Sequence, residues 1–294
     1  MADKQATTQR DGFKSKWGFI LACIGSAVGM GNIWRFPIMV SLWGGMTFLI
    51  PYFICVILIG STGVIGEFAL GRATGAGPIG AFGKCTELRG NRKIGEAIGF
   101  IPVLGSMALA IGYTVVMGWI FKYTAIAITG DMHAMGQDMA AIGGHFDIVA
   151  ISNLPWIIVA IVASFAIMAM GVSGGIEKAN KVMMPVLFFL FVGLGIYIAF
   201  LPGASEGYKY IFTLDPKGLA NPMVWIFAFG QAFFSLSVTG SGMIVYGAYL
   251  SKDEDVVGVA QHTAVFDTIA AVVAALVIIP ACFSYGLDVG AGPS

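Results

Sequence analysis

Charged residues are scarce in this sequence. Only 11% of its 294 residues are Asp, Glu, Lys or Arg, and 57% are hydrophobic, whereas a soluble domain carries about 25% charged residues. The mean hydropathy of +0.86 indicates the same bias. A soluble core cannot hide so much apolar surface, so the long apolar runs must face lipid or one another. The scarcity of charge therefore predicts an integral membrane protein whose main partner is the lipid bilayer.

Neither sign of charge is in excess, since 16 Lys and Arg balance 16 Asp and Glu. No basic stripe is present that could neutralise phosphates, so nucleic acid is not an expected partner. The four cysteines, Cys23, Cys55, Cys85 and Cys282, have no C-x-x-C spacing and are interpreted as reduced structural thiols. The polar first 16 residues and the long glycine-containing apolar run after them do not resemble a cleavable signal peptide.

Seven apolar segments approach the roughly 20 residues that a spanning helix needs. They lie at 15–38, 43–71, 95–127, 153–171, 180–201, 222–249 and 260–286. In lipid only helices and closed barrels satisfy every backbone polar group, and these segments lack the polar–apolar alternation of barrel strands. The sequence therefore predicts an all-α membrane protein in which residues 1–294 form a single membrane domain.

The basic residues predict an orientation. Twelve Lys and Arg precede the first span or follow spans 2, 4 and 6, and only Lys209 and Lys217 lie in loops of the other side. Because cytoplasmic loops carry the excess of basic residues, the N-terminus is expected in the cytoplasm. Seven spans then place the C-terminal end of this chain outside the cell membrane. Segments 128–152 and 202–221 are expected to be external loops.

Two spans carry small and polar residues at their centres. The first contains Gly-Ser-Ala-Val-Gly-Met-Gly-Asn at 25–32, and the sixth contains Ser-Leu-Ser-Val-Thr-Gly-Ser-Gly at 235–242. One such segment alone favours close helix packing through small residues. Two of them, five helices apart, indicate a pair of unwound helices, whose free carbonyls can bind a cation and whose half-helix N-termini can bind an anion.

Four motifs in these spans resemble the neurotransmitter:sodium symporter family. They are G-S-A-V-G-M-G-N-I-W-R-F-P at 25–37, G-E-F-A-L-G-R at 66–72, G-V-S-G-G-I-E-K-A-N-K-V-M-M-P at 171–185 and G-Q-A-F-F-S-L-S at 230–237. The resemblance implies an inverted-repeat transporter fold with broken helices 1 and 6. Only seven of the usual ten or more helices are expected here, as a first five-helix repeat at 1–201 and the start of a second repeat at 202–294.

The resemblance also implies two sodium sites, the first largely complete. Its expected ligands are the backbone carbonyl of Ala27, the side-chain oxygens of Asn32 and Ser235, and the carboxylate of Asp267. In the second site, Gly25 and Val28 offer carbonyls, and the other ligands belong to an eighth helix outside this chain. Because the Asp267 carboxylate supplies a fixed negative charge beside the first ion, no chloride requirement is expected.

A small amino acid is the substrate that the resemblance implies. Its carboxylate is expected at the backbone N–H groups around Met30 and Gly31 and at the Tyr113 hydroxyl, and its amino group at carbonyls near Ala27, Phe234 and Ser237. The expected side-chain pocket consists of Leu109, Tyr113, Phe234, Ser237, Thr239 and Gly240. Gly29 stands where monoamine carriers of the family have Asp, which favours an α-amino acid whose own carboxylate takes that place.

Several polar residues are assigned to gating or support by the same resemblance. Arg35 and Gln231 are assigned to the outer gate. Arg10 and Phe13 resemble a cytoplasmic latch, to which Tyr246 and Tyr249 can contribute. The acidic partners of both gates belong to the missing helices. Glu67 is expected to brace the unwound part of helix 1.

Two functions stay open from the sequence. The first is a sodium-coupled symporter that moves a neutral amino acid, apolar in character, into the cell. The second is a non-transporting membrane binder or subunit, or a fragment that needs a partner chain to supply the missing helices. A retinal protein is excluded because segment 7 has no lysine for a Schiff base. An enzyme is not expected, because no nucleophile–base pair or metal cluster occurs at mid-membrane.

Overall fold

The computed structural model describes residues 16–136, 139–250 and 254–288, and every regular element within these ranges is helical. Four helices are long and apolar enough to cross a membrane alone: Met46–Thr74, Arg92–Thr129, Val172–Ala199 and Val256–Tyr285. Two bent pairs also meet these criteria: Trp17–Ala27 with Gly31–Leu42, and Ile142–Ile151 with Leu154–Ala169. The apolar helix Pro222–Ser235 is shorter. These elements correspond in order to the seven expected spans.

Each span is built from one or more helical pieces. In chain order the elements are α1 (Lys16–Ala27), η1 (Gly31–Arg35), α2 (Phe36–Leu42), α3 (Met46–Ile59), η2 (Gly60–Val64), α4 (Ile65–Thr74), α5 (Pro78–Glu87), α6 (Arg92–Thr129), α7 (Asp131–Ala134), α8 (Met139–Ile151), α9 (Leu154–Ala169), η3 (Val172–Ile176), α10 (Glu177–Ala199), α11 (Ala204–Phe212), η4 (Gly218–Ala220), α12 (Pro222–Ser235), η5 (Val238–Gly240), α13 (Gly242–Ala248) and α14 (Val256–Tyr285). Helix 1 thus comprises α1, η1 and α2, and helix 6 comprises α12, η5 and α13.

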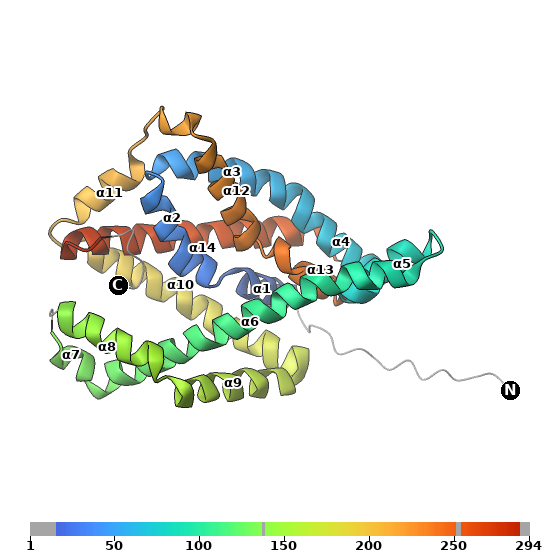
Figure 1. Cartoon of the computed structure of the whole chain (residues 1–294), viewed down its shortest axis with the longest axis horizontal. Helices are drawn as coiled ribbons and strands as arrows, with labels where there is room; N and C mark the ends of the chain where they lie inside the picture. Colours follow the sequence, from blue (N-terminus) through green and yellow to red (C-terminus); the bar gives the residue numbers. More distant parts are fainter. Residues whose placement is uncertain (1–15, 137–138, 251–253, 289–294) are drawn as a thin grey trace.

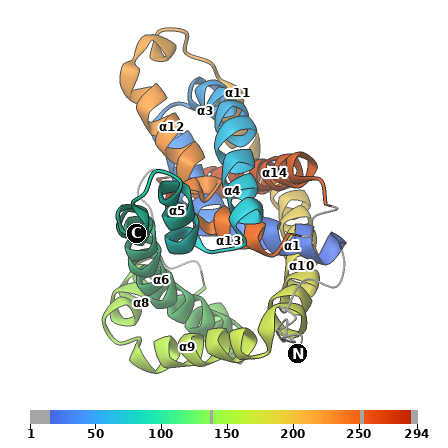
Figure 2. The same ribbon diagram turned by 90° about the vertical axis from the view of Figure 1, so that its right-hand side faces the viewer.

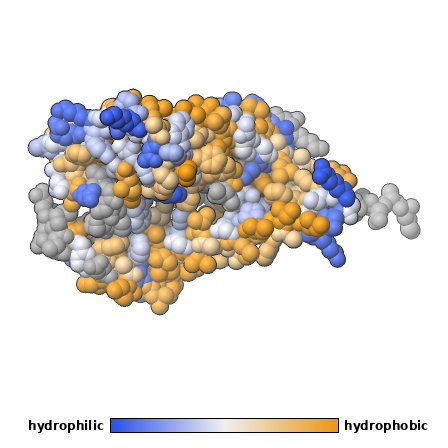
Figure 3. Space-filling view, turned by 45° about the horizontal axis from the view of Figure 1, so that its top comes forward, coloured by the Kyte–Doolittle hydropathy of each residue, from blue (hydrophilic) through white to orange (hydrophobic). Residues whose placement is uncertain are grey.

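The long helices share one direction. Figure 1 shows α6, α10 and α14 running along the longest axis of the molecule. Both views place α3 and α12 on one side of α14, and α8 and α9 on the opposite side (Figures 1 and 2). On the face in Figure 3, hydrophobic residues fill most of the middle, and hydrophilic residues gather toward the two ends. This distribution fits a protein whose middle section lies in the hydrocarbon core of a bilayer.

Local sequence signals set the helix ends. The side chain of Asn221 accepts a hydrogen bond from Met223 N–H at 3.0 Å and caps α12, which begins at Pro222. Asp255 caps α14 in the same way through Val257 N–H, also at 3.0 Å. These side chains satisfy N–H groups that the first turn of a helix leaves without partners. Helix α6 ends at Gly130, whose φ of 87° few other residues adopt.

The expected external loop at 128–152 is wrong in part, because α7 and α8 lie within it. The aspartates of this segment favour a loop, but the segment also carries the apolar pattern of a helix. Ile142, Phe146 and Val149 recur at i, i+4 and i+7, which is the spacing of one helix face. The Phe146 ring packs edge-on against Trp119 of α6, with ring centroids 5.5 Å apart. The apolar face of α8 therefore covers part of α6.

The connection at 202–221 contains helix α11, and it contacts helix 1, the start of α3 and the end of α14. The Tyr210 hydroxyl donates to the carbonyl of Ser41, and Met46 N–H donates to the Thr213 carbonyl at 3.2 Å. Gly207 lies so close to α14 that a Cβ would stand 2.5 Å from Pro280 Cα. This segment therefore fixes helix 1 and the start of α3 against the end of α14.

The second half of helix 6 rests directly on helix 2, which comprises α3, η2 and α4. A Cβ on Gly71 of α4 would stand 2.1 Å from the carbonyl oxygen of Ile244, and one on Gly247 of α13 would stand 2.5 Å from that of Phe68. Small residues allow helix backbones in a membrane to approach this closely. Glycines on both helices therefore bring α4 and α13 into backbone contact.

Substitution of Gly71 tests this contact. We expect Gly71→Ala to destabilise the folded chain by about 1–3 kcal/mol, because the new methyl group would overlap backbone atoms that cannot rotate away. The measurement is the thermal unfolding midpoint of the purified protein in detergent. Gly66→Ala is the matched control, since α4 leaves open space around that position. Equal midpoints for the two variants would contradict the backbone contact.

Candidate ion and substrate site

The centre of helix 1 is unwound. Helix α1 ends at Ala27, and the chain resumes helical form at Gly31, with a bend of 53° between the two parts. The Gly29 N–H, which a continuous helix would direct to Gly25, donates instead to Asn32 Oδ1 at 3.0 Å. The Asn32 N–H donates to the Gly29 carbonyl at 3.1 Å, not to Val28. The carbonyls of Gly25 and Val28 thus lose the N–H donors that a continuous helix would give them, and their role as sodium ligands stays a prediction.

The centre of helix 6 is unwound as well. Helix α12 ends at Ser235 and α13 begins at Gly242, with the short turn η5 between them. Ser237 and Ser241 flank η5 with φ values of 57° and 52°. This left-handed conformation costs a residue with a Cβ roughly 1–2 kcal/mol. Both predicted breaks are therefore confirmed, and the second one contains strained backbone.

Three buried polar side chains join the two breaks to α14. Asn32 Nδ2 donates to Asp267 Oδ1 at 2.7 Å and to the Asp267 carbonyl at 3.0 Å. The Ser235 hydroxyl donates to Asp267 Oδ2 at 2.6 Å, and Asn32 Nδ2 lies 3.3 Å from the Ser235 hydroxyl. All three residues are at most 1% exposed. Residues 32, 235 and 267 thus form one hydrogen-bonded cluster inside the spanning region.

The cluster fits a sodium ion in its donor atoms. Its side chains offer two carboxylate oxygens, a hydroxyl and an amide. Ala27, which precedes Asn32 in the chain, is the last residue of α1. Hard alkali and alkaline-earth cations favour such oxygen ligands. In this conformation, however, the Asn32 amide directs its NH₂ group to Asp267 and its oxygen to Gly29. Rotation of the amide by 180° would exchange the two atoms and bring the oxygen toward the carboxylate.

Helices 1 and 6 contact each other again above the cluster. Gln231 Nε2 donates to the Gly31 carbonyl at 2.9 Å, and its own Oε1 is buried with no partner in the part of the chain that is described. The Phe234 ring lies so close to Gly31 that a Cβ there would stand 2.9 Å from it. The Arg35 guanidinium lies 5.0 Å from the centre of the same ring, which is a cation–π distance. Arg35 and Gln231, the two residues assigned to the outer gate, thus connect helix 1 to helix 6.

Helix α6 contributes the other wall. Leu109 and Tyr113 are each 40% exposed, so neither is enclosed by the described residues. The direct contact of α6 with helix 6 is made by Ser106, whose hydroxyl donates to the Gly240 carbonyl at 2.9 Å. The backbone of Thr239 lies in η5, and its side chain is outside the description. The residues assigned to the side-chain pocket therefore lie on α6 and around the break of helix 6, and their roles stay predictions.

Below the breaks, Tyr246 of α13 lies near helix 1. Its hydroxyl interacts with the Ser26 side chain, and α13 contacts α1. Tyr249 follows directly after α13. Arg10 and Phe13, the other members of the expected latch, lie outside the described residues. Of that latch, the structure therefore describes only the tyrosines.

Glu67 lies next to the second half of helix 6. The backbone N–H groups of Met243 and Ile244, in the first turn of α13, interact electrostatically with its carboxylate, whose Oε2 atom is buried with no hydrogen-bond partner among the described residues. A carboxylate at a helix N-terminus satisfies free N–H groups and opposes the positive end of the helix dipole. The structure thus places Glu67 beside helix 6, and the expected brace on helix 1 stays a prediction.

Gly25 lies beside α10. A Cβ on Gly25 would stand 1.8 Å from Asn180 Oδ1, so this amide fills the space that glycine leaves. Asn180 Nδ2 donates to the Ile176 carbonyl at 2.9 Å. One turn earlier, Glu177 fills the equivalent space at Gly18 and pairs with Lys181 at 2.6 Å. The polar residues of α10 thus fix the position of α1.

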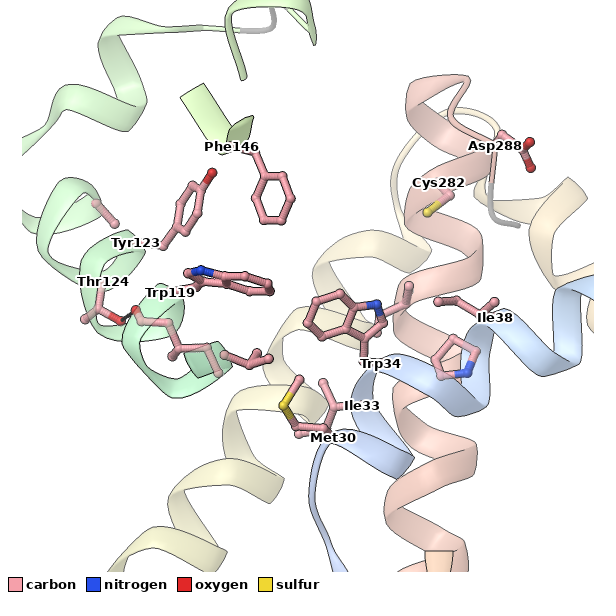
Figure 4. A pocket seen from close by; sticks show the side chains of 15 residues that line it. Met30, Ile33, Trp34, Ile38, Trp119, Tyr123, Thr124, Phe146, Cys282 and Asp288 are labelled. Atoms are coloured by element: carbon pink, nitrogen blue, oxygen red, sulfur yellow. Dashed lines mark hydrogen bonds between the residues drawn. The ribbon is translucent and has the colours of Figure 1, made fainter. Parts of the chain in front are cut away.

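An apolar cavity of about 670 Å³ lies between the second half of helix 1 and the C-terminal half of α6. Met30 and Trp34 line it from helix 1, and Trp119, Tyr123 and Phe146 face them from α6 and α8 (Figure 4). The Trp34 and Trp119 rings approach to 6.3 Å between centroids. The cavity joins the predicted substrate residue Met30 to the outer half of α6.

Sequence reasoning missed Ser106, Glu177 and Asn180. Glu177 and Asn180 stand in a motif used for the resemblance, but their partners Gly18 and Gly25 are more than 150 residues away in the chain. Ser106 gave a usable signal. It is a hydroxyl residue in an apolar span and lies three and seven residues before Leu109 and Tyr113, which places all three on one helix face.

The family model described as the sodium:neurotransmitter symporter family matches residues 10–136 and 137–285. The chain belongs to this family. A sodium-dependent transporter of Haemophilus influenzae is 31% identical over 293 residues, which cover 97% of this chain and 64% of that protein. The mouse sodium-dependent neutral amino acid transporter B(0)AT3 is 31% identical over 268 residues, which cover 82% of this chain and 43% of that protein. These family relatives are transporters and not enzymes.

The fold agrees with a solved structure of this family. The crystal structure of MhsT in complex with L-phenylalanine matches with a TM-score of 0.85 and 37% sequence identity, over 97% of this chain and 64% of that one. The predicted fold, with broken helices 1 and 6 in a multi-pass membrane protein, is therefore confirmed. The chain spans 64% of the length of MhsT and of the Haemophilus relative.

The buried cluster predicts a stability effect. Replacement of Asn32 by Ala removes the donor to Asp267 Oδ1, and a buried acceptor left without a partner costs about 1–3 kcal/mol. We expect Asn32→Ala to lower the thermal unfolding midpoint in detergent. Gln261→Ala is the control, because this amide lies exposed on the same helix as Asp267 and its loss should change stability by less than about 0.5 kcal/mol. If both variants melt together, Asn32 does not support the cluster.

Proposed function

We propose that this chain carries the ion and substrate site of a sodium-coupled symporter that moves a neutral amino acid of apolar character into the cell. The observation that carries the proposal is the meeting of Asn32, Ser235 and Asp267 at the breaks of helices 1 and 6. One carboxylate among neutral oxygen donors provides a single negative charge. Such a site suits a monovalent hard cation better than a divalent one.

The proposed coupling is direct contact between ion and substrate. The substrate carboxylate would bind the N–H groups around Met30 and Gly31, where the second half of helix 1 begins and its dipole is positive. There it would also become a ligand of the sodium ion held by Ala27, Asn32, Ser235 and Asp267. The neutral amino acid transporter name of the mouse relative and the phenylalanine in the MhsT complex support a neutral α-amino acid.

The proposed cycle opens the site to one side at a time. Helices 1, 2, 6 and 7 would rock as a bundle, which the backbone contact between α4 and α13 supports. Arg35 and Gln231 would act at the outer gate, and Tyr246 and Tyr249 at the inner one. The second sodium ion would bind Gly25 and Val28 with further ligands from helices outside this chain. We further propose a cytoplasmic N-terminus and an outside position for the end of α14.

A second candidate is a membrane binder or subunit that keeps the site but does not transport alone. It follows from the length of the chain, which is 64% of that of MhsT. Flux separates the two candidates. Saturable uptake of an amino acid into proteoliposomes, driven by a sodium gradient with this chain alone, would exclude the second. Sodium-dependent binding without flux would favour it, with a partner chain as the source of the remaining helices.

Ion-dependent binding tests the site. We expect the purified 294-residue chain to bind radiolabelled neutral amino acids in sodium but not in potassium. Ser235→Ala and Asp267→Ala should weaken binding by more than about tenfold, since each removes a ligand or the charge of a buried ion site. Binding should be the same in sodium chloride and sodium gluconate, because the Asp267 carboxylate takes the place of an anion.

Gln261→Ala serves as the control in this assay, and size-exclusion profiles show whether each variant is folded. Equal binding in sodium and potassium would refute sodium coupling. Binding that needs chloride would refute only the role given to Asp267. No binding in either ion would mean that the site needs helices beyond this chain, and the symporter proposal would then fail for this chain alone.

The orientation can be tested with a native thiol. Cys85 is exposed on α5, and Cys23 and Cys55 are buried. We expect a membrane-impermeant maleimide to label Cys85 in inside-out vesicles and not in right-side-out vesicles, because α5 lies between spans 2 and 3 among basic residues. Cys282→Ser serves as the background, and Cys85→Ser should abolish the signal. Labelling from the outside would reverse the proposed topology.

A further inference from the structure

The hydroxyl residues of α6 differ in what they bind. Thr114 and Thr124 each donate to the carbonyl four residues earlier in the same helix, at 2.7 and 2.8 Å. This is the common arrangement for Ser and Thr in a membrane helix, where a hydroxyl has few other acceptors. Ser106 does not follow it and donates to Gly240 of helix 6 at 2.9 Å. The bond joins positions 134 residues apart and therefore serves tertiary structure.

Ser106 lies at one end of the proposed pocket. Leu109 and Tyr113 follow it at i+3 and i+7 on the same face of α6. With a rise of 1.5 Å per residue, they stand about 4.5 and 10.5 Å further toward the Gly130 end. Because Arg92 begins α6 on the proposed cytoplasmic side, Ser106 is at the inner end of the pocket wall. Figure 1 shows α6 extending in both directions past this region.

The acceptor lies in the strained part of helix 6. Gly240 ends η5, and Ser237 and Ser241 on either side have positive φ values. A left-handed serine persists only where its surroundings hold it. The hydroxyl of Ser106 is a fixed donor on the continuous helix α6, so it anchors this segment from outside. The position of η5 relative to α6 therefore depends on this bond.

Ser106 and Gly240 approach each other most closely at the Ser106 hydroxyl. A Cβ on Gly240 would stand 2.8 Å from Ser106 Oγ but 4.0 Å from Ser106 Cβ. The first distance is an overlap, and the second is ordinary van der Waals contact. The hydroxyl alone thus restricts position 240 to glycine on this side. Removal of the Ser106 hydroxyl would therefore make room for a methyl group on residue 240.

We propose that Ser106 is a specificity-determining residue, whose hydrogen bond to Gly240 holds η5 against α6 and closes the inner end of the pocket for the substrate's side chain. This inference rests on the proposed function and deepens it. With the bond in place, the pocket has a fixed depth. Without it, η5 moves away from α6, and small side chains lose contact while large ones still reach the pocket walls.

Binding of two amino acids of different size tests the proposal. The probes are radiolabelled L-alanine and L-phenylalanine, each in sodium, with the full chain and its variants in detergent. For Ser106→Ala we expect the ratio of the alanine Kd to the phenylalanine Kd to rise about threefold to tenfold, the effect of one lost neutral hydrogen bond. Thr114→Ala is the matched control, because its hydroxyl bonds within α6, and its ratio should stay unchanged.

A double-mutant cycle tests the geometry. Gly240→Ala should weaken binding of both amino acids by about tenfold or more, because the new methyl group overlaps the Ser106 hydroxyl. In Ser106→Ala/Gly240→Ala the overlap is gone, so binding should recover to within about threefold of Ser106→Ala. Such recovery is the sign of two residues in contact. If the double variant is as weak as Gly240→Ala, the contact is not the one described and the proposal fails.

These experiments test the specificity role of Ser106 and the proposed function separately. Equal weakening of alanine and phenylalanine in Ser106→Ala would mean that the hydroxyl is only structural, which would overturn the specificity role and leave the proposed function intact. Absence of sodium-dependent binding by the unmodified chain would overturn the proposed function, and the specificity role with it. A changed size ratio in Ser106→Ala with an unchanged one in Thr114→Ala would support both.

Discussion

The hydrogen-bonded cluster of Asn32, Ser235 and Asp267 is the interaction on which the site depends. Each residue belongs to a different span, and each is at most 1% exposed. A charged or polar group at this depth is costly unless another protein group binds it. Each of the three satisfies the other two, so helices 1, 6 and 7 can hold polar groups inside the membrane only when they are together. Removal of one member would leave at least one buried polar atom of the other two without its partner.

The breaks in helices 1 and 6 are tolerated because neighbouring elements hold each half. At helix 6, Gln231 binds the first half to Gly31, and the Glu67 carboxylate lies beside the first turn of the second half. At helix 1, Asn180 and Glu177 of α10 fill the spaces at Gly25 and Gly18. Backbone groups freed by unwinding in lipid need partners of this kind. The glycines that let these groups approach are therefore as necessary as the polar residues themselves.

Composition alone predicted the spans and both breaks, because lipid permits few backbone solutions and each break concentrates glycine and hydroxyl residues. Residues 32, 235 and 267 were assigned by resemblance, and the structure brings them together. The helix at 139–151 was missed because the aspartates in and before it outweighed an apolar face made by Ile142 and Phe146. The partners of Glu67 and the direction of the Asn32 amide depend on contacts between distant segments, which a single sequence does not encode locally. The repeat boundary at residue 201 stays a prediction.

The Asn32 amide can in principle take two orientations, which exchange its oxygen and its NH₂ group. Its NH₂ group now satisfies the Asp267 carboxylate, and its oxygen satisfies Gly29 N–H. A cation beside Asp267 would repel that NH₂ group and favour the turned amide, whose oxygen is a ligand. The turned amide releases Gly29 N–H at the unwound centre of helix 1, one residue before Met30. Ion binding would thereby free an N–H group next to the place proposed for the substrate carboxylate, so a single amide rotation would couple the two ligands.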